Sequence, residues 1–179
     1  MTDFTFYNLE TAPAESKALL QDIEKAYGFI PNLFAYMAES PQVLEAYLKL
    51  NELISNTSFT PAQQQLALLA VSIENKCGFC AVAHRAMAKL KGADQKSIDA
   101  VNNQTPLESA SDQALVTMVQ TMVRKRGWLD DAEVDAFIAA GFSKQQVFEL
   151  ILIVSIKTLS NYSNHLTLPE PNEELLDML

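Results

Sequence analysis

Both cysteines of the chain and one of its two histidines lie within a single short segment, from Cys77 to His84. Cys77 and Cys80 are three residues apart, Cys80 and His84 are four apart, and Cys77 and His84 are seven apart. In an α-helix, all three separations place side chains on one face. Alanines and other good helix formers follow Cys80, and Gly92 stands where a helix would end. We therefore predict that two thiols and an imidazole meet on the first turns of one helix.

Such an arrangement has a definite chemistry. A thiol at a helix N-terminus feels the positive end of the backbone dipole, which lowers its pKa and favours the thiolate. An imidazole one turn further along can take or return the proton. The pattern therefore predicts a redox dithiol with its own base, needing no cofactor. The alternative is a purely structural role, in which Cys77 and Cys80 are small buried apolar residues.

Two other interpretations of the CxxC pair were weighed. Cys77, Cys80 and His84 could supply three zinc ligands, with His165 as the fourth. No second CxxC exists, however, and nothing in the local sequence brings His165 close, so no metal is expected. A thioredoxin-type site needs a strand before the CxxC. Because the preceding segment is helical in pattern, we discard that fold and keep the dithiol chemistry.

The remaining sequence predicts an all-α protein. Five glycines in 179 residues suit long helices, and no segment alternates with a period of two. Thr60, Pro61 and Gln63 form a helix start with a capping box, and Ser143 with Gln146 forms another. We expect residues 1–12 to be extended and residues 1–179 to form one domain. The expected helices cover residues 14–27, 31–37, 41–54, 61 into the cysteine segment, 94–102, 111–126, 130–140, 143–165 and a short tail piece in 173–179.

Composition narrows the possible partners. The net charge of −9 disfavours nucleic acid and anionic membranes, because phosphate binding needs clustered Lys and Arg. No signal peptide is recognisable, and the apolar run 150–156 is too short to span a bilayer. We therefore expect a cytoplasmic protein. The helices containing 61–73 and 147–156 are too apolar for one small bundle, so we expect a homo-oligomer. Trp128, Met118 and Met122 are assigned to the core.

The segment LALLAVSIENKCGFCAVAHRAMAKLKG resembles the signature of the AhpD-like (alkylhydroperoxidase D-like) proteins of the carboxymuconolactone decarboxylase superfamily. The TPAQQQ helix start precedes it, and Gly141, a long apolar helix and the sequence Asn161-Tyr-Ser-Asn-His165 follow it in the expected order. The resemblance covers about residues 30–170. It implies an AhpD-like helical bundle, interlocked in an obligate oligomer (a dimer, trimer or hexamer), and thiol-dependent reduction of peroxides.

The resemblance also implies roles for the residues of the segment. Cys80 would attack the peroxide and become a sulfenic acid, and Cys77 would resolve it as an intramolecular disulfide. His84 would belong to the proton relay that activates the thiols. The opposite assignment of the two cysteines stays open. An external dithiol or lipoyl-type reductant would restore the site.

Two positions depart from the family pattern. The founding enzyme has a relay glutamate twelve positions before the first cysteine, and Gln65 stands there in this chain. Glu74 is the nearest acid and could substitute, or it could be a solvated surface charge. A second family histidine between the cysteines is Phe79 here. His165 either caps the end of its helix or takes part in the site, and Tyr162 and Asn164 are hydrogen-bonding groups of a core or interface.

The predicted function is reduction of hydroperoxides by a cofactor-free dithiol antioxidant enzyme. A peroxide would enter an apolar pocket beside Cys80. Lactone decarboxylation is an alternative that would not need two thiols, and a redox sensor or oligomeric scaffold without turnover is another. We expect the pocket walls to come from Leu66, Leu69, Ile73, Phe79 and Val82.

Overall fold

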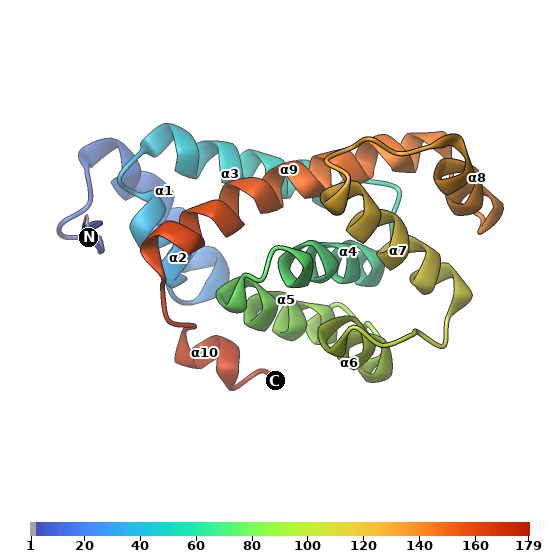
Figure 1. The fold of residues 1–179 in the computed structure, drawn as a ribbon. Helices are drawn as coiled ribbons and strands as arrows, with labels where there is room; N and C mark the ends of the chain where they lie inside the picture. Colours follow the sequence, from blue (N-terminus) through green and yellow to red (C-terminus); the bar gives the residue numbers. More distant parts are fainter. Residues whose placement is uncertain (1–2) are drawn as a thin grey trace.

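The structure, a computed structural model that describes residues 3–179, consists of helices joined by short connections. No strand occurs within that range, and the prediction of an all-α fold is confirmed. Residues 1 and 2 of the segment predicted as extended lie outside the described residues. The helices in chain order (Figure 1) are α1 (Ala14–Tyr27), α2 (Asn32–Met37), α3 (Pro41–Ser55), α4 (Pro61–Glu74), α5 (Gly78–Leu90), α6 (Gln95–Asn103), α7 (Ala110–Arg124), α8 (Asp131–Ala139), α9 (Lys144–Thr167) and α10 (Glu173–Leu176).

Local signals in the sequence determine most helix ends. The Thr60 side chain accepts from the Gln63 backbone while the Gln63 side chain accepts from the Thr60 backbone, so the predicted capping box starts α4. Ser143 and Gln146 start α9 in the same way. Gly28 ends α1 with a φ of 82°, a left-handed conformation that glycine adopts without steric cost.

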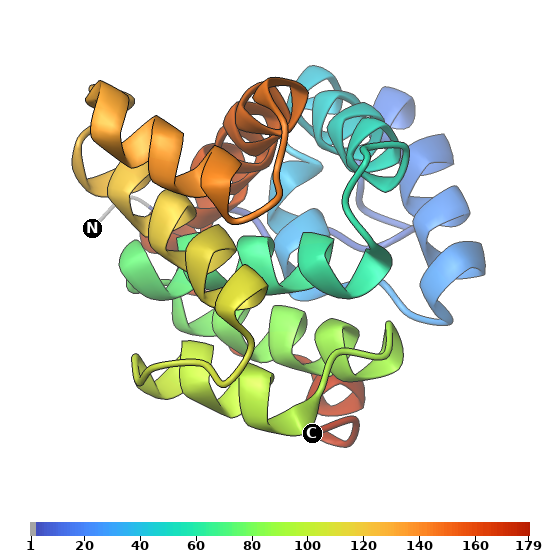
Figure 2. The same ribbon diagram turned by 90° about the vertical axis from the view of Figure 1, so that its right-hand side faces the viewer.

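Helix α4 lies at the centre of the molecule and contacts α5, α6, α7 and α9. It forms a hairpin with α5, and α6 packs below that hairpin, as Figures 1 and 2 show. Helix α9 runs the length of the molecule and contacts α2, α3, α4, α5 and α7. The turn between α4 and α5 therefore lies against the C-terminal half of α9, which brings residues about 80 positions apart into one site.

The apolar faces of these helices form a hydrophobic core in which Leu69, Val71 and Ile153 are fully buried. Met118 and Met122 belong to this core, as predicted. The assignment of Trp128 to the core is wrong, because 85% of its surface is exposed. Helix α7 ends at Arg124, two residues before the predicted end, and Trp128 stands on the exposed loop that follows.

No single helix in residues 3–179 is both long and apolar enough to cross a membrane. Helices α8 and α9 meet the length and composition criteria only when taken together, with an angle of 109° between them.

Candidate active site

The turn between α4 and α5 places the first cysteine just outside a helix. Lys76 adopts a left-handed φ of 57°, and its N–H donates to the Ile73 carbonyl while the Cys77 N–H donates to the Ser72 carbonyl. These two bonds form a Schellman motif that ends α4. Cys77 is consequently extended and caps α5, whereas Cys80 lies in its first turn. The prediction that both cysteines lie within one helix is therefore correct only for Cys80.

Both thiols are reduced and buried, each about 2% exposed. The amide of Asn164, on α9, donates to both, with Nδ2 at 3.2 Å from the Cys80 Sγ and 3.6 Å from the Cys77 Sγ. The Ser160 Oγ lies 4.0 Å from the Cys80 Sγ. The two sulfurs thus share one amide donor, and α9 forms the wall of the site beside them.

The two thiols have opposite protonation behaviour. Cys77 donates a hydrogen bond to the Cys80 sulfur, and this bond lowers the pKa of Cys80 to about 5 against the opposing effect of burial, with help from the Lys157 ammonium and the Asn161 amide. The same bond, together with burial, raises the pKa of Cys77. The two shifts therefore favour a thiolate at Cys80 and a thiol at Cys77. A thiolate is the nucleophilic form of cysteine.

His84 links the thiols to α4 and α9. Its Nδ1 lies 3.0 Å from the Gln65 Oε1, and its Nε2 lies 2.9 Å from the Lys157 Nζ. Burial, and then the charge of Lys157, lower the pKa of His84 well below its usual value. The imidazole is therefore neutral, with Nδ1–H donating to Gln65 and Nε2 accepting from Lys157. Gln65, His84 and Lys157 form one hydrogen-bonded network, and the Lys157 ammonium is close enough to Cys80 to lower the pKa of its thiol.

The other predicted site residues make different contacts. Glu74 lies near Arg124 of α7, with 3.8 Å between the Glu74 Oε1 and the Arg124 Nε. His165 is exposed on α9, and its ring stacks on that of Tyr162. Phe79 is buried in the core. Within residues 3–179, no three His, Cys, Asp or Glu side chains are grouped so that they could hold a metal ion.

Lys157 and Asn161 belong to the site, although the motif spacing did not predict a role for either side chain. Lys157 is only 1% exposed, and Asn161 is fully buried with its Oδ1 accepting from the Asn75 amide at 2.9 Å. A signal for Lys157 exists, because it is the single charged residue in the stretch 150–164 and directly follows the apolar run 150–156. A charged side chain is seldom fully buried without a partner.

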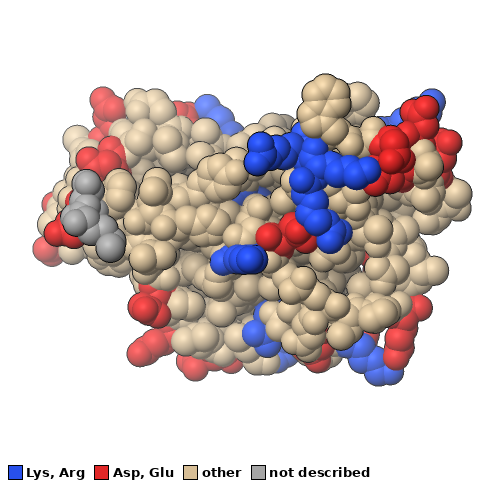
Figure 3. Space-filling view, viewed as in Figure 1, with Lys and Arg blue, Asp and Glu red and all other residues tan. Residues whose placement is uncertain are grey.

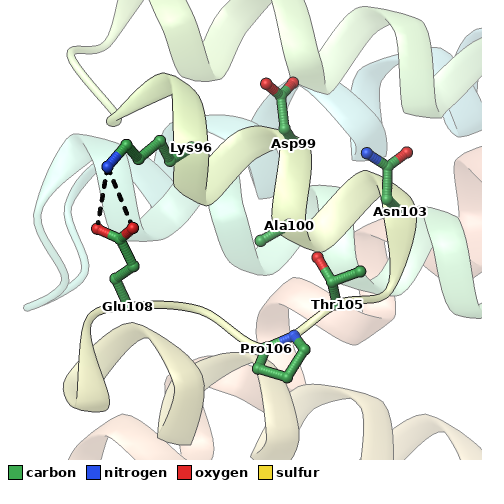
Figure 4. Close-up of a pocket in the computed structure, with 7 residues that line it drawn as sticks. All are labelled: Lys96, Asp99, Ala100, Asn103, Thr105, Pro106 and Glu108. Carbon is green, nitrogen blue, oxygen red and sulfur yellow. Dashed lines mark hydrogen bonds and ion pairs between the residues drawn. The ribbon is translucent and has the colours of Figure 1, made fainter.

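The prominent surface hollows lie away from the thiols. One, of about 290 Å³, is formed by α6 and the loop after it, where Lys96 and Glu108 pair at 3.1 Å (Figure 4). A second, of about 270 Å³, lies between α6 and α7. None of the five residues predicted to line an apolar pocket takes part in either hollow, and Leu66 and Leu69 are buried in the core.

Charge is distributed unevenly over the face drawn in Figure 3. Lys and Arg side chains gather over the C-terminal end of α7, where Arg124, Lys125 and Arg126 are exposed. Lys125 pairs with Asp130 and Glu133, and Arg124 lies near Glu74. Nearby carboxylates thus offset two of these three positive charges.

Comparison with known proteins finds a family match over the segment that contains the two thiols. Residues 41–108, which include both cysteines and His84, match the model of the carboxymuconolactone decarboxylase family. No protein with a curated function matches the sequence significantly.

Several solved structures share the fold over nearly the whole chain. An alkylhydroperoxidase AhpD-core, peroxidase-related protein from Ralstonia eutropha JMP134 has a TM-score of 0.85 at 19% identity, covering 96% of this chain and 93% of its own. A peroxidase-related protein from Silicibacter sp. TM1040 has a TM-score of 0.80 at 22% identity, covering 97% and 92%. A cysteine-to-alanine variant of the debrominase Bmp8, in complex with 2,3,4-tribromopyrrole, has a TM-score of 0.80 at 16% identity, covering 99% and 96%.

The fold and the matched segment define a helical protein with a CxxC pair at the turn between its two central helices. Residues 41–108 match the carboxymuconolactone decarboxylase family, and the whole chain has the fold of the AhpD-core protein described above. The diversity of its structural neighbours, which include a debrominase, means that its reaction must be argued from its own site.

Proposed function

We propose that the protein is a cofactor-free dithiol peroxidase that reduces alkyl hydroperoxides through a disulfide cycle of Cys77 and Cys80. One observation carries the proposal: the Cys77 and Cys80 sulfurs lie 3.6 and 3.2 Å from the same Asn164 Nδ2, and the contact between the thiols lowers the pKa of Cys80. The nucleophile and its resolving group are therefore in contact before any substrate arrives. A disulfide can form between them with little rearrangement.

In the first half of the cycle, the Cys80 thiolate attacks one oxygen of the hydroperoxide. An S–O bond forms and the O–O bond breaks, and the expelled alkoxide takes up a proton to become an alcohol. Cys80 is then a sulfenic acid. Cys77 next attacks the Cys80 sulfur, which forms the disulfide and releases water. An external dithiol or lipoyl-type reductant returns both thiols to the reduced state.

The hydrogen bonds that join Gln65, His84 and Lys157 support this cycle, although the relay glutamate is missing. A glutamine cannot exchange a proton, but its Oε1 accepts from the His84 Nδ1–H and holds the ring in one tautomer. The lone pair on Nε2 then faces Lys157. The charge that stabilises the thiolate comes from the lysine, so no carboxylate is needed beside His84.

We further propose that the protein acts as a homo-oligomer in a reducing compartment such as the cytoplasm. Phe148, Ile151, Tyr162 and Leu166 are all exposed on α9, the first of them by 73%. Their spacing repeats at about the helical period, so they form a stripe along the outer side of the helix. A second copy of the chain covering this stripe would remove a large apolar surface from water.

Steady-state turnover tests the proposal against its alternatives. Wild-type protein with an alkyl hydroperoxide and a dithiol should consume many equivalents of peroxide, and Cys80→Ser and Cys77→Ser should each abolish this turnover. A redox sensor would instead oxidise once per chain and stop. Carboxymuconolactone decarboxylase-type activity would persist in both variants when a lactone is supplied, and no peroxide would be consumed.

A further inference from the structure

We propose that Lys157 is the general acid that protonates the leaving oxygen of the peroxide, and that the Asn161 amide helps to hold this oxygen. The inference rests on the proposed peroxidase function and names the proton donor that this function requires. Both side chains come from α9, on the side of the site formed by Ser160 and Asn164. A peroxide that reaches the Cys80 sulfur from that side would meet them.

The positive charge of Lys157 lies in an unusual position. The Nζ is buried, and no carboxylate pairs with it anywhere in residues 3–179. Its hydrogen-bond partner is the neutral His84 at 2.9 Å. The neighbouring anion is the Cys80 thiolate. An ammonium that is buried without a counter-ion is costly, so the charge of Lys157 depends on that thiolate for compensation.

This dependence gives the proton transfer its timing. As the Cys80 sulfur forms its bond to oxygen, the negative charge moves from sulfur to the departing oxygen. Lys157 then loses the anion that compensated its charge, at the moment when a new and more basic anion appears. Transfer of a proton from Nζ to this oxygen removes both charges together.

The Asn161 amide also supports this role. Its Oδ1 accepts from the Asn75 Nδ2 at 2.9 Å, which fixes the direction of the side chain. Its Nδ2 is buried without any nitrogen or oxygen acceptor in the described chain. A buried N–H without such an acceptor is uncommon and needs an explanation. We interpret it as a donor reserved for the thiolate and then for the leaving oxygen.

The remaining steps balance with the same lysine. The neutral Lys157 amine accepts the proton of the Cys77 thiol as Cys77 attacks the Cys80 sulfenic acid. The hydroxide that leaves takes this proton and departs as water, so the oxidised site holds a disulfide and a neutral lysine. The external dithiol then supplies two protons and two electrons, which restore the Cys77 thiol, the Cys80 thiolate and the Lys157 ammonium.

The test measures how the rate of Cys80 oxidation depends on the leaving group. Reduced wild type, Lys157→Met and Lys157→Arg are each mixed with an alkyl hydroperoxide, whose alkoxide needs a proton, and with a peroxycarboxylic acid, whose carboxylate does not. Iodoacetamide alkylation of Cys80 in each variant corrects for the change in its thiolate fraction. After this correction, the rate of Cys80 oxidation in Lys157→Met should fall about 100-fold or more with the alkyl hydroperoxide, and only slightly with the peroxyacid.

Lys157→Arg distinguishes the effect of the positive charge at position 157 from the effect of proton donation. Arginine keeps a positive charge beside the thiolate but does not give up its proton near neutral pH. It should therefore show the same selective loss with the alkyl hydroperoxide, which keeps the test decisive if Lys157→Met does not fold. Equal corrected losses with both oxidants would overturn the role of Lys157 as an acid. A wild-type protein that reacts with neither oxidant would instead overturn the proposed function itself.

Discussion

The Lys157 Nζ lies 2.9 Å from the Nε2 of His84, so a buried ammonium of α9 donates to a neutral imidazole of α5. Two positive charges at this distance would repel each other, which is one reason why the pKa of His84 lies well below its usual value. The proton between the two groups therefore belongs to the lysine. The proposed donation of a proton by Lys157 depends on this position of the proton.

Gln65→Glu should move that proton. A carboxylate 3.0 Å from the His84 Nδ1 favours the imidazolium, so the pKa of His84 should rise by one unit or more. Titration of the histidine ring protons by NMR measures this directly, with the exposed His165 as an internal reference. An unchanged His84 titration would show that residue 65 does not face the ring in solution.

Asn164→Asp should raise the pKa of the Cys80 thiol. The substitution replaces an N–H donor 3.2 Å from the sulfur with a negative charge of almost the same shape. The ultraviolet absorbance of the thiolate, followed against pH, reports the shift, and peroxide consumption at neutral pH should fall at least tenfold. Asn164→Leu is the matched control, which removes the donor without adding charge. If the two variants have the same thiolate titration, the amide does not contact Cys80.

The reduced protein should become more stable as pH rises above about 5. Cys80 has a pKa of about 5 when folded and, as an ordinary thiol, about 8.5 when unfolded. Between these values the unfolded chain binds more protons, so the free energy of unfolding rises with pH by at most about 1.4 kcal/mol per unit, and the gain is lost as pH falls through 5. Urea unfolding of wild type and Cys80→Ser across this range measures the difference. Parallel curves for the two proteins would contradict the lowered pKa.

Phe148→Glu should weaken the proposed oligomer. Phe148 is among the most exposed apolar side chains of the outer stripe of α9, so a charge there would be buried in any contact that covers the stripe. Light scattering should give more than one chain for wild type at low micromolar concentration and a smaller assembly for the variant. Gln21→Glu, exposed on α1, adds the same acidic charge away from the stripe as a control. A monomeric wild type would contradict the proposal.

Much of the helical architecture could be predicted because its boundaries have local causes. Capping boxes at Thr60 and Ser143, and glycine at position 28, act through backbone groups within a few residues of themselves. The end of α4 was harder to place, because Lys76 takes the left-handed conformation that glycine usually provides. The sequence pattern therefore placed both cysteines on the first turns of a helix, whereas Cys77 is the cap that precedes α5, where the chain turns.

Only part of the site could be predicted from the sequence. Cys77, Cys80 and His84 were found because their spacing is local, and Gln65 was found through the family resemblance. Lys157, which lies more than 70 positions beyond Cys80 in the chain, meets the thiolate only because α9 packs against α5. Its burial, which makes it chemically significant, is a property of the tertiary fold.

The most direct test of the central claim is a single turnover of the reduced protein with one equivalent of an alkyl hydroperoxide. The account predicts one equivalent of alcohol and a Cys77–Cys80 disulfide, seen in the intact mass as the loss of two hydrogens. In Cys77→Ser the same addition should leave Cys80 as a sulfenic acid that dimedone traps. Intact hydroperoxide with both thiols still free, or trapping at Cys77 in Cys80→Ser, would contradict the account.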